Sequence, residues 1–289
     1  MTDAHIQDEL DRARRQGPVR DIIIPPCPEL LRQLQEATAY SEPNIVAIDQ
    51  IASADVAMAA ALIRQANSPL YALTQPVKTV GQAMTVLGLK PSVAVLLGFL
   101  TRGALHVQSP VLDHFWESST RRAIACEHIG QQLYDMDPGL AYSFGLFCHV
   151  GIPVMLRGVK GYASTMTEAL ARKDRTFTQT ENANHRTDHA VVGAIVARTW
   201  RLPAEVAVAV RLHHDFSSLG EERFSQTVRH LVAMGLIADH LVHVHEGVPP
   251  AKEWDLYSPG CLAHLQVDES EVEMWVDQLH PAFENASVH

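Results

Sequence analysis

The fold class of the chain can be read from residues 188–215, DHAVVGAIVARTWRLPAEVAVAVRLHHD. Apolar residues recur here at helical spacing in two successive runs, and Asp188 stands where an N-cap residue is expected. The stretch therefore predicts two consecutive helices, over residues 188–201 and 203–214. The same helical spacing continues in both directions along nearly the whole chain, which predicts an all-α protein.

Further helices are predicted on both sides of this stretch, separated by short polar or proline-containing segments. They are expected near residues 2–16, 30–37, 43–51, 55–66, 80–87, 91–105, 111–134, 140–156, 162–173, 222–245 and 269–278. The stretch RTFTQT (175–180) could form a short strand, but we predict a loop. The loop HVQSP (106–110) is the expected boundary between two lobes. We therefore expect an N-terminal extension, a first lobe, a second lobe and a C-terminal extension over residues 1–20, 21–108, 109–246 and 247–289.

Composition and charge narrow the class of protein. The chain has 289 residues, of which 47% are hydrophobic and 19% charged, values typical of a globular protein. Its formal net charge of −10 argues against a general nucleic-acid binder, which needs excess lysine and arginine to neutralise phosphates. The four cysteines show no CxxC spacing, so we expect buried thiols in a reducing compartment.

No targeting segment is evident at the start of the sequence. The first residues are charged and lack the apolar run of a signal peptide. Val93–Leu100, taken as the longest apolar stretch, is too short to span a bilayer. We therefore expect a cytoplasmic protein without membrane insertion.

Histidine is the unusual component, with 16 residues in all. Imidazole and carboxylate groups are metal ligands, and converging helices could bring five of them together: His149, His189, His213, His214 and Asp239. The alternative is that each histidine is structural and hydrogen-bonded to the backbone. His240 and His243 lie three residues apart and could also chelate an ion, although a solvated helix end near His245 explains them as well.

The order of these segments resembles the HDOD family of bacterial signalling proteins, which are related to HD phosphohydrolases and HD-GYP cyclic-di-GMP phosphodiesterases. The resemblance covers roughly residues 20–245. In the first lobe it rests on IIIPPCPELL, IASADVAMAAALIRQANSPLY and VKTVGQAMTVLGLKPSVAVLL, and in the second on FWESSTRRAIA, GLFCHVGIPVM, DHAVVGAIVARTWRLP and AVAVRLHHD. The resemblance implies two lobes, the second of them HD-like, and cytoplasmic regulation through contacts with other signalling proteins.

Carried over residue by residue, the resemblance implies a degenerate HD pocket. The alignment puts Ser118 at the place of the first histidine, and Val150 at the place of the aspartate that would bridge two metal ions beside His149. His189, His213, His214 and Asp239 match the retained positions, while DFSSLGEER after the two histidines has no GYP-type loop. Hydrolysis by the parent mechanism is therefore not expected.

Three functional hypotheses follow from this resemblance. The first is a non-catalytic regulatory protein that needs no cofactor and acts through protein–protein contacts. The second is a phosphohydrolase with one divalent metal ion and residual activity. The third is a sensor that binds a nucleotide without cleaving it, helped by Arg121, Arg122 and Arg211. Asn67 and Ser68 are expected to end a helix near a groove between the lobes, where capping alone would also explain them.

Overall fold

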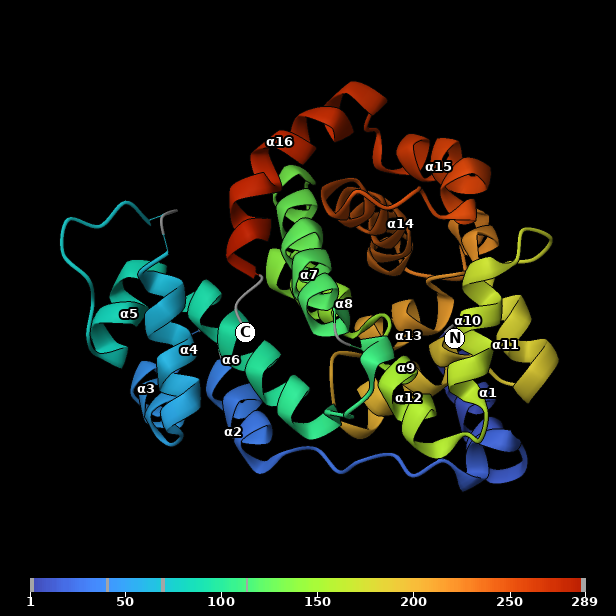
Figure 1. The fold of residues 1–289 in the computed structure, drawn as a ribbon, viewed down its shortest axis with the longest axis horizontal. Helices are drawn as coiled ribbons and strands as arrows, with labels where there is room; N and C mark the ends of the chain where they lie inside the picture. Colours follow the sequence, from blue (N-terminus) through green and yellow to red (C-terminus); the bar gives the residue numbers. More distant parts are fainter. Residues whose placement is uncertain (1–2, 40–41, 69–70, 113, 287–289) are drawn as a thin grey trace. The chain divides into compact units, whose positions relative to one another are not determined.

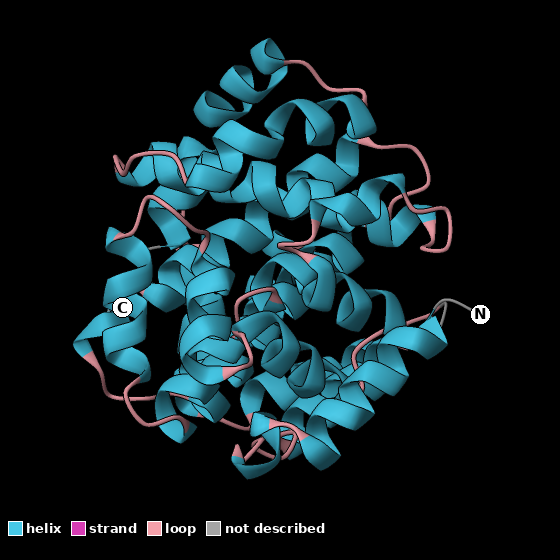
Figure 2. Ribbon diagram, turned by 90° about the vertical axis from the view of Figure 1, so that its right-hand side faces the viewer, coloured by secondary structure: helices cyan, strands magenta, loops and turns pink. Residues whose placement is uncertain are grey.

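The computed structural model describes residues 3–39, 42–68, 71–112 and 114–286. Helices, turns and loops account for all of these residues, and none of them lies in a strand (Figure 2). The all-α prediction is therefore confirmed. The chain divides into two compact units: unit 1 contains Met1–Ile24 and Val107–Phe283, and unit 2 contains Pro25–His106 and Glu284–His289.

Unit 2 is built from five consecutive helices. They are α2 (Glu29–Thr38), α3 (Ile45–Ser53), α4 (Val56–Ala66), α5 (Val80–Leu87) and α6 (Leu89–Leu105) (Figure 1). Helix α4 begins where its sequence predicts, because the Asp55 carboxylate accepts hydrogen bonds from the backbone N–H groups of Ala57 and Met58 at 2.8 and 2.9 Å. Apolar side chains on one face of α2 and α4 are buried, as their helical spacing requires: Leu31, Leu34, Met58 and Leu62.

Asn67 ends α4 and holds the loop that follows. Its side-chain amide donates to the carbonyl of Val77 at 2.9 Å and accepts from the N–H of Val77 at 2.8 Å. This pair of bonds satisfies a loop backbone that would otherwise need water, and it gives Asn67 a structural role. Ser68 is half-buried beside it. A groove between the lobes near these two residues stays a prediction.

Unit 1 holds the remaining helices. They are α1 (Asp3–Gln16), α7 (Phe115–Gln132), α8 (Pro138–Phe147), α9 (Gly151–Gly158), α10 (Tyr162–Ala171), α11 (Phe177–His185), α12 (His189–Thr199), α13 (Ala204–Leu212), α14 (Gln226–Glu246), α15 (Lys252–Leu265) and α16 (Glu269–Ala286). Short 3₁₀ turns occupy Pro18–Asp21, Pro110–Leu112 and Phe216–Gly220. Helix α14 packs between α7 and α15 (Figure 1), and eleven of its residues are buried. It is therefore a central element of the unit 1 core.

Helix α1, expected as a separate extension, packs within unit 1 against α12 and α13. Leu10 is fully buried, and the contact is bordered by ion pairs from Arg198 to Asp11 at 2.8 Å and from Arg211 to Glu9 at 2.6 Å. Burial of the apolar face rather than these half-exposed ion pairs supplies most of the contact's stability.

The loop predicted at residues 175–180 is confirmed for residues 175 and 176 and wrong from Phe177 onward, where α11 begins. Thr176 and Gln179 form a capping box: the Thr176 side chain accepts from the N–H of Gln179, and the Gln179 side chain accepts from the N–H of Thr176. The T-x-x-Q spacing that signals this cap was present in the sequence and overlooked. The omission matters because α11 carries a residue of the site described below.

The single helix predicted over residues 140–156 is interrupted by a turn at Cys148–Val150, between α8 and α9. Pro153 lies in the first turn of α9, and a proline four residues after His149 cannot donate to the His149 carbonyl. That carbonyl instead accepts from the N–H of Ile152 at 2.9 Å. The interruption places His149 at a helix junction.

Among the described residues, the one helical stretch that is long and apolar enough to cross a membrane is Pro138–Gly158, which does not include Val93–Leu100. Its mean hydropathy of 1.6 and length of 21 residues would suit a membrane span, but 72% of it is buried inside the fold. Two bent helix pairs, Ile45–Ser53 with Val56–Ala66 and Val80–Leu87 with Leu89–Leu105, are long and apolar enough only if each pair is counted as one span. Packing within the protein accounts for the apolar character of Pro138–Gly158.

Candidate functional site

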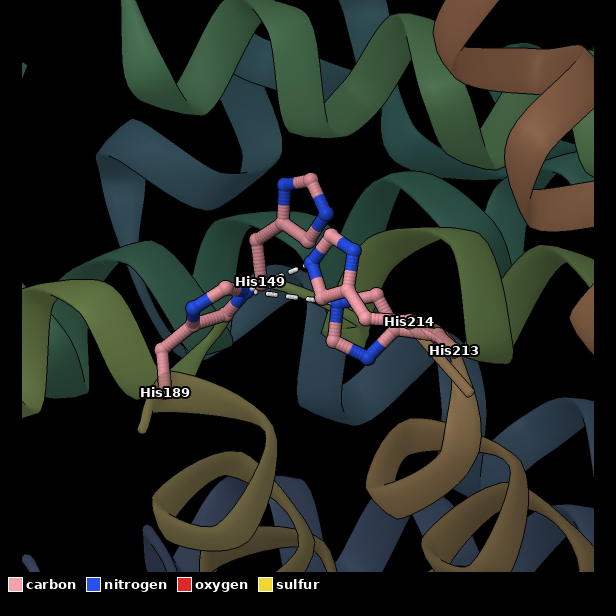
Figure 3. Close-up of side chains that lie close together, drawn as sticks. All are labelled: His149, His189, His213 and His214. Atoms are coloured by element: carbon pink, nitrogen blue, oxygen red, sulfur yellow. Dashed lines mark hydrogen bonds between the residues drawn. The ribbon is translucent and has the colours of Figure 1, made fainter. Parts of the chain in front are cut away.

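Four histidines that are far apart in the sequence meet in unit 1 (Figure 3). His149 lies in the turn between α8 and α9, His189 is the first residue of α12, and His213 and His214 follow the last turn of α13. One ring nitrogen of each lies within 4.8 Å of the others. We call this group the histidine cluster.

Gly151 on α9 and Gly193 on α12 allow these two helices to approach closely. A β-carbon placed on Gly151 would lie 2.0 Å from the carbonyl oxygen of His189 and 2.8 Å from the backbone nitrogen of Gly193. The backbones of α9 and α12 therefore touch at Gly151, two residues after His149. This contact brings His149 beside His189, and their ring centroids are 5.3 Å apart.

Three of the four rings are fixed by an acceptor on Nδ1. His189 Nδ1 faces Glu181 Oε2 at 2.7 Å, and His213 Nδ1 faces the Val210 carbonyl at 2.6 Å. His214 Nδ1 faces both carboxylate oxygens of Glu253 at 3.0 Å. A carbonyl or carboxylate oxygen can only accept, so each Nδ1 carries a proton, and the neutral form of each ring presents an Nε2 lone pair.

These Nε2 atoms point at one another. His189 Nε2 lies 3.3 Å from His213 Nε2 and 3.1 Å from His214 Nε2. Facing lone pairs repel unless a proton or a cation lies between them. Metal-binding histidines are typically oriented in this way, with the second nitrogen donating to a carboxylate or carbonyl. The donor set fits one transition-metal ion, which the histidine cluster would hold.

Glu181 and Glu253 are site residues that the sequence analysis missed. Glu181 is fully buried on α11, where it also accepts from the Tyr162 hydroxyl and from the His189 N–H. The loop predicted around residue 180 concealed its place on a helix. Glu253 lies in α15, a helix that is absent from those expected from the sequence. Neither carboxylate has a sequence spacing that would reveal its histidine partner.

Asp239, expected among the metal ligands, is engaged by an arginine. Arg122 on α7 donates from Nε to Asp239 Oδ1, and its side chain is 8% exposed. The other oxygen, Oδ2, lies 3.6 Å from His149 Nε2. Arg122, proposed above as a helper for an anionic ligand, therefore neutralises the carboxylate that faces His149.

Ser118 does not reach the histidine cluster by any hydrogen bond among the described residues. Its hydroxyl donates to Glu246 at 2.6 Å, and the same carboxylate accepts from Arg121 at 2.8 Å. The residue of α7 that faces Asp239 is Arg122, one turn further along the helix. The position given by the alignment thus lies on the same helix as Arg122, one turn before it.

Val150 is fully buried and packs toward α12. One of its methyl groups lies 3.5 Å from the position that a β-carbon of Gly193 would occupy. A valine has no lone pair, so this position supplies no bridging ligand.

His240, which together with His243 was proposed as a separate chelating pair, stacks on Trp254. Their ring centroids are 3.7 Å apart, which favours a packing role for His240.

The pKa values of the cluster diverge. Burial, together with the charge of Arg122 and the neighbouring histidines, lowers the pKa of His149 well below its usual range. Burial and the neighbouring rings of His214 and His189 also lower the pKa of His213 well below its usual range. Burial opposes the charged form of His214 as well, but Glu253 outweighs it and raises the pKa of His214. His149 and His213 are thus held neutral, as metal ligation requires.

These shifts predict an acid-sensitive fold in protein stripped of metal. Below pH 6.5 the unfolded chain protonates His149 and His213 while the folded chain does not, so the unfolding free energy falls by up to about 1.4 kcal/mol per pH unit for each residue. The raised pKa of His214 has the opposite effect. Its contribution to the unfolding free energy is complete below pH 6.5 and is lost as the pH rises above 6.5. We expect maximal stability near pH 6.5.

Urea unfolding in EDTA from pH 5 to 8 measures this effect. Tryptophan fluorescence reports on unit 1, because all four tryptophans lie there: Trp116, Trp200, Trp254 and Trp275. The His149→Gln/His213→Gln variant should lose most of the acid slope. A wild-type stability that stays flat from pH 6.5 to 5 would contradict the assignment of two neutral histidines.

Fold and site together define a helical protein in which four histidines converge within one compact unit. The HDOD domain model matches residues 24–216, about two thirds of the sequence. The chain therefore belongs to the HDOD domain family, as its sequence motifs predicted.

Solved structures share this fold. An HDOD domain protein of unknown function from Geobacter sulfurreducens has a TM-score of 0.76 at 20% identity, covering 98% of this chain and 97% of its own. A protein of Shewanella amazonensis named as a candidate phosphohydrolase has a TM-score of 0.73 at 20% identity, covering 98% of this chain and 97% of its own. At this identity the likeness concerns the fold alone.

One curated relative is an uncharacterised protein of Treponema pallidum. It is 23% identical over 203 residues, which cover 69% of this chain. The match spans 39% of that relative's length.

Proposed function

We propose that this protein is a non-catalytic regulatory member of the HDOD family, which acts through contacts with other signalling proteins. The single observation that carries the proposal is the pairing of Arg122 with Asp239 beside the histidine cluster. A two-metal hydrolytic site needs carboxylates that bridge its ions and orient the attacking water. Here Val150 has no ligand atom, and Asp239 is bound to a buried guanidinium.

Electrostatics supports the same conclusion. The Arg122 guanidinium carries a permanent positive charge at the place where a second cation would contact Asp239. A divalent ion placed against this guanidinium would be repelled in a poorly solvated environment. One ion in the histidine cluster could still organise the surrounding helices, but the pair of ions that the parent mechanism uses would not form.

The test is an assay for phosphoester hydrolysis by the full chain. The substrates are bis(p-nitrophenyl) phosphate, cyclic dinucleotides and nucleoside triphosphates, each tried with Mn²⁺, Fe²⁺, Ni²⁺, Co²⁺ and Zn²⁺. We expect turnover no higher than that of the His213→Ala/His214→Ala variant, which removes two of the four histidines.

Metal-dependent turnover by the wild type that the double substitution abolishes would overturn the proposal and favour the single-metal phosphohydrolase. A nucleotide that raises the melting temperature without being hydrolysed would instead favour a sensor, because a ligand of the native state stabilises it. A circular dichroism spectrum must first show that the double variant is folded. The Arg198→Gln variant, altered at the α1 contact, serves as a substitution control away from the cluster.

A further inference from the structure

The histidine cluster has one neighbouring carboxylate that is not already bound to an imidazole Nδ1. Glu181 and Glu253 each accept a hydrogen bond from a ring Nδ1. Asp239 does not: its Oδ1 accepts from Arg122, and its Oδ2 lies 3.6 Å from His149 Nε2. Whether the pocket offers oxygen ligands to a metal ion therefore depends on Arg122.

We propose that Arg122 acts as a built-in cation that, through its charge and its bond to Oδ1, weakens Asp239 as a metal ligand and makes the site prefer one borderline transition-metal ion held by imidazole nitrogens, such as Zn²⁺ or Ni²⁺. The inference rests on the same site as the proposed function but concerns metal selectivity rather than activity. Imidazole suits Zn, Cu and Ni, whereas Mg²⁺ and Mn²⁺ prefer carboxylate, carbonyl and water oxygens. Arg122 is thus a positioning residue that excludes the harder ions.

The geometry of the arginine supports this role. Its side chain is 8% exposed and extends from α7 to α14, joining residues 117 positions apart. A guanidinium is always charged and donates in fixed directions, so it cannot release Asp239 by losing a proton. A histidine at this position could do so. The pairing is therefore permanent over the physiological pH range.

The cluster is also arranged to hold an ion tightly. Its ligands come from the α8–α9 turn, the start of α12 and the end of α13. Three of the rings are oriented by Glu181, Glu253 and the Val210 carbonyl. An ion bound there would link three elements of unit 1, so binding should raise the unfolding temperature.

The experiment compares metal affinities of wild type and Arg122→Gln by calorimetric titration of EDTA-stripped protein with ZnSO₄ and MnCl₂. For the wild type we expect one Zn²⁺ per chain and no measurable Mn²⁺ binding at millimolar concentration. Arg122→Gln should free Asp239 as an oxygen ligand and tighten Mn²⁺ binding by at least tenfold, while Zn²⁺ affinity changes little. Arg122→Lys keeps the charge and should retain the wild-type preference.

Two matched controls accompany this comparison. Arg198→Gln removes an arginine that is paired with Asp11 at the α1 contact, so it makes the same charge change away from Asp239. It should leave both affinities unchanged. Arg122→Gln/Asp239→Asn replaces the ion pair by two amides, and it should keep wild-type Zn²⁺ affinity within threefold without gaining Mn²⁺. This double variant also keeps the inference testable if Arg122→Gln alone does not fold.

Three results would overturn the inference. They are Mn²⁺ binding by the wild type as tight as Zn²⁺ binding, a loss of Zn²⁺ affinity of tenfold or more in Arg122→Gln/Asp239→Asn, and the absence of Zn²⁺ binding by the wild type. The failure of the proposed function is a separate outcome. A protein that selects Zn²⁺ and yet hydrolyses a phosphoester would retain this inference and lose the proposed function.

Discussion

Alanine at position 151 is expected to unfold unit 1 or to lower its unfolding free energy by roughly 3 kcal/mol or more. The added β-carbon would lie 2.0 Å from the His189 carbonyl oxygen and 2.8 Å from the Gly193 nitrogen. Both are backbone atoms, so relief requires that α9 and α12 separate. Separation would also move His149 away from His189. Urea unfolding followed by tryptophan fluorescence measures the loss.

Alanine variants at two other glycines serve as comparisons for this prediction. Gly260 lies inside α15 with no atom within 4 Å of an added β-carbon, so Gly260→Ala should be neutral or stabilise unit 1 by up to about 1 kcal/mol. Gly193→Ala should fall between the two, because its nearest contacts would be 3.1 Å to Val210 and 3.2 Å to the Gly151 nitrogen. Equal stabilities for the alanine variants at positions 151 and 260 would show that the α9–α12 contact does not determine stability.

The second large effect is expected at Glu181, where alanine should destabilise unit 1 by about 3 kcal/mol and weaken metal binding by 10- to 100-fold. The buried carboxylate accepts from the Tyr162 hydroxyl and from two nitrogens of His189, the backbone N–H at 3.3 Å and Nδ1 at 2.7 Å. Its removal leaves these donors buried without an acceptor. It also frees the His189 ring to turn or to change tautomer, which explains the expected loss of affinity.

Calorimetric titration with Zn²⁺ and urea unfolding in EDTA separate the two effects. Glu181→Gln keeps one acceptor oxygen. It should therefore lose less unfolding free energy and less Zn²⁺ affinity than Glu181→Ala. Glu168→Ala removes a half-exposed glutamate that pairs with Arg172 and accepts from Asn184, and it should change both quantities far less than Glu181→Ala does. Zn²⁺ affinity in Glu181→Ala equal to that of the wild type would refute the role of Glu181 in orienting His189.

Much of the local structure was predictable because its causes lie within a few residues. Asp188 caps α12 by accepting from the Val191 N–H at 2.9 Å, as its place before an apolar run indicated. The capping box at Thr176 has an equally local cause, and α11 was missed only because its spacing was overlooked. The family motifs likewise consist of short segments in a fixed order.

The relations that define the site were not predictable in this way. The sequence analysis named His149, His189, His213 and His214 as candidate ligands, but no local spacing showed that their ring nitrogens converge. The bond from Arg122 to Asp239 joins positions 117 residues apart, and that from His214 to Glu253 joins positions 39 apart. Such partners have no fixed spacing, because they depend on how whole helices pack.

The sequence by itself thus determined the all-α class, most helix starts, the family and the set of candidate ligands, since helical periodicity and capping act within one or two turns. Only the tertiary structure decided which groups face one another. The contact at Gly151 sets the distance between α9 and α12, and packing of α7 against α14 places Arg122 on Asp239. Close-packed helices leave room for one arrangement of these side chains, and that arrangement determines the chemistry of the pocket.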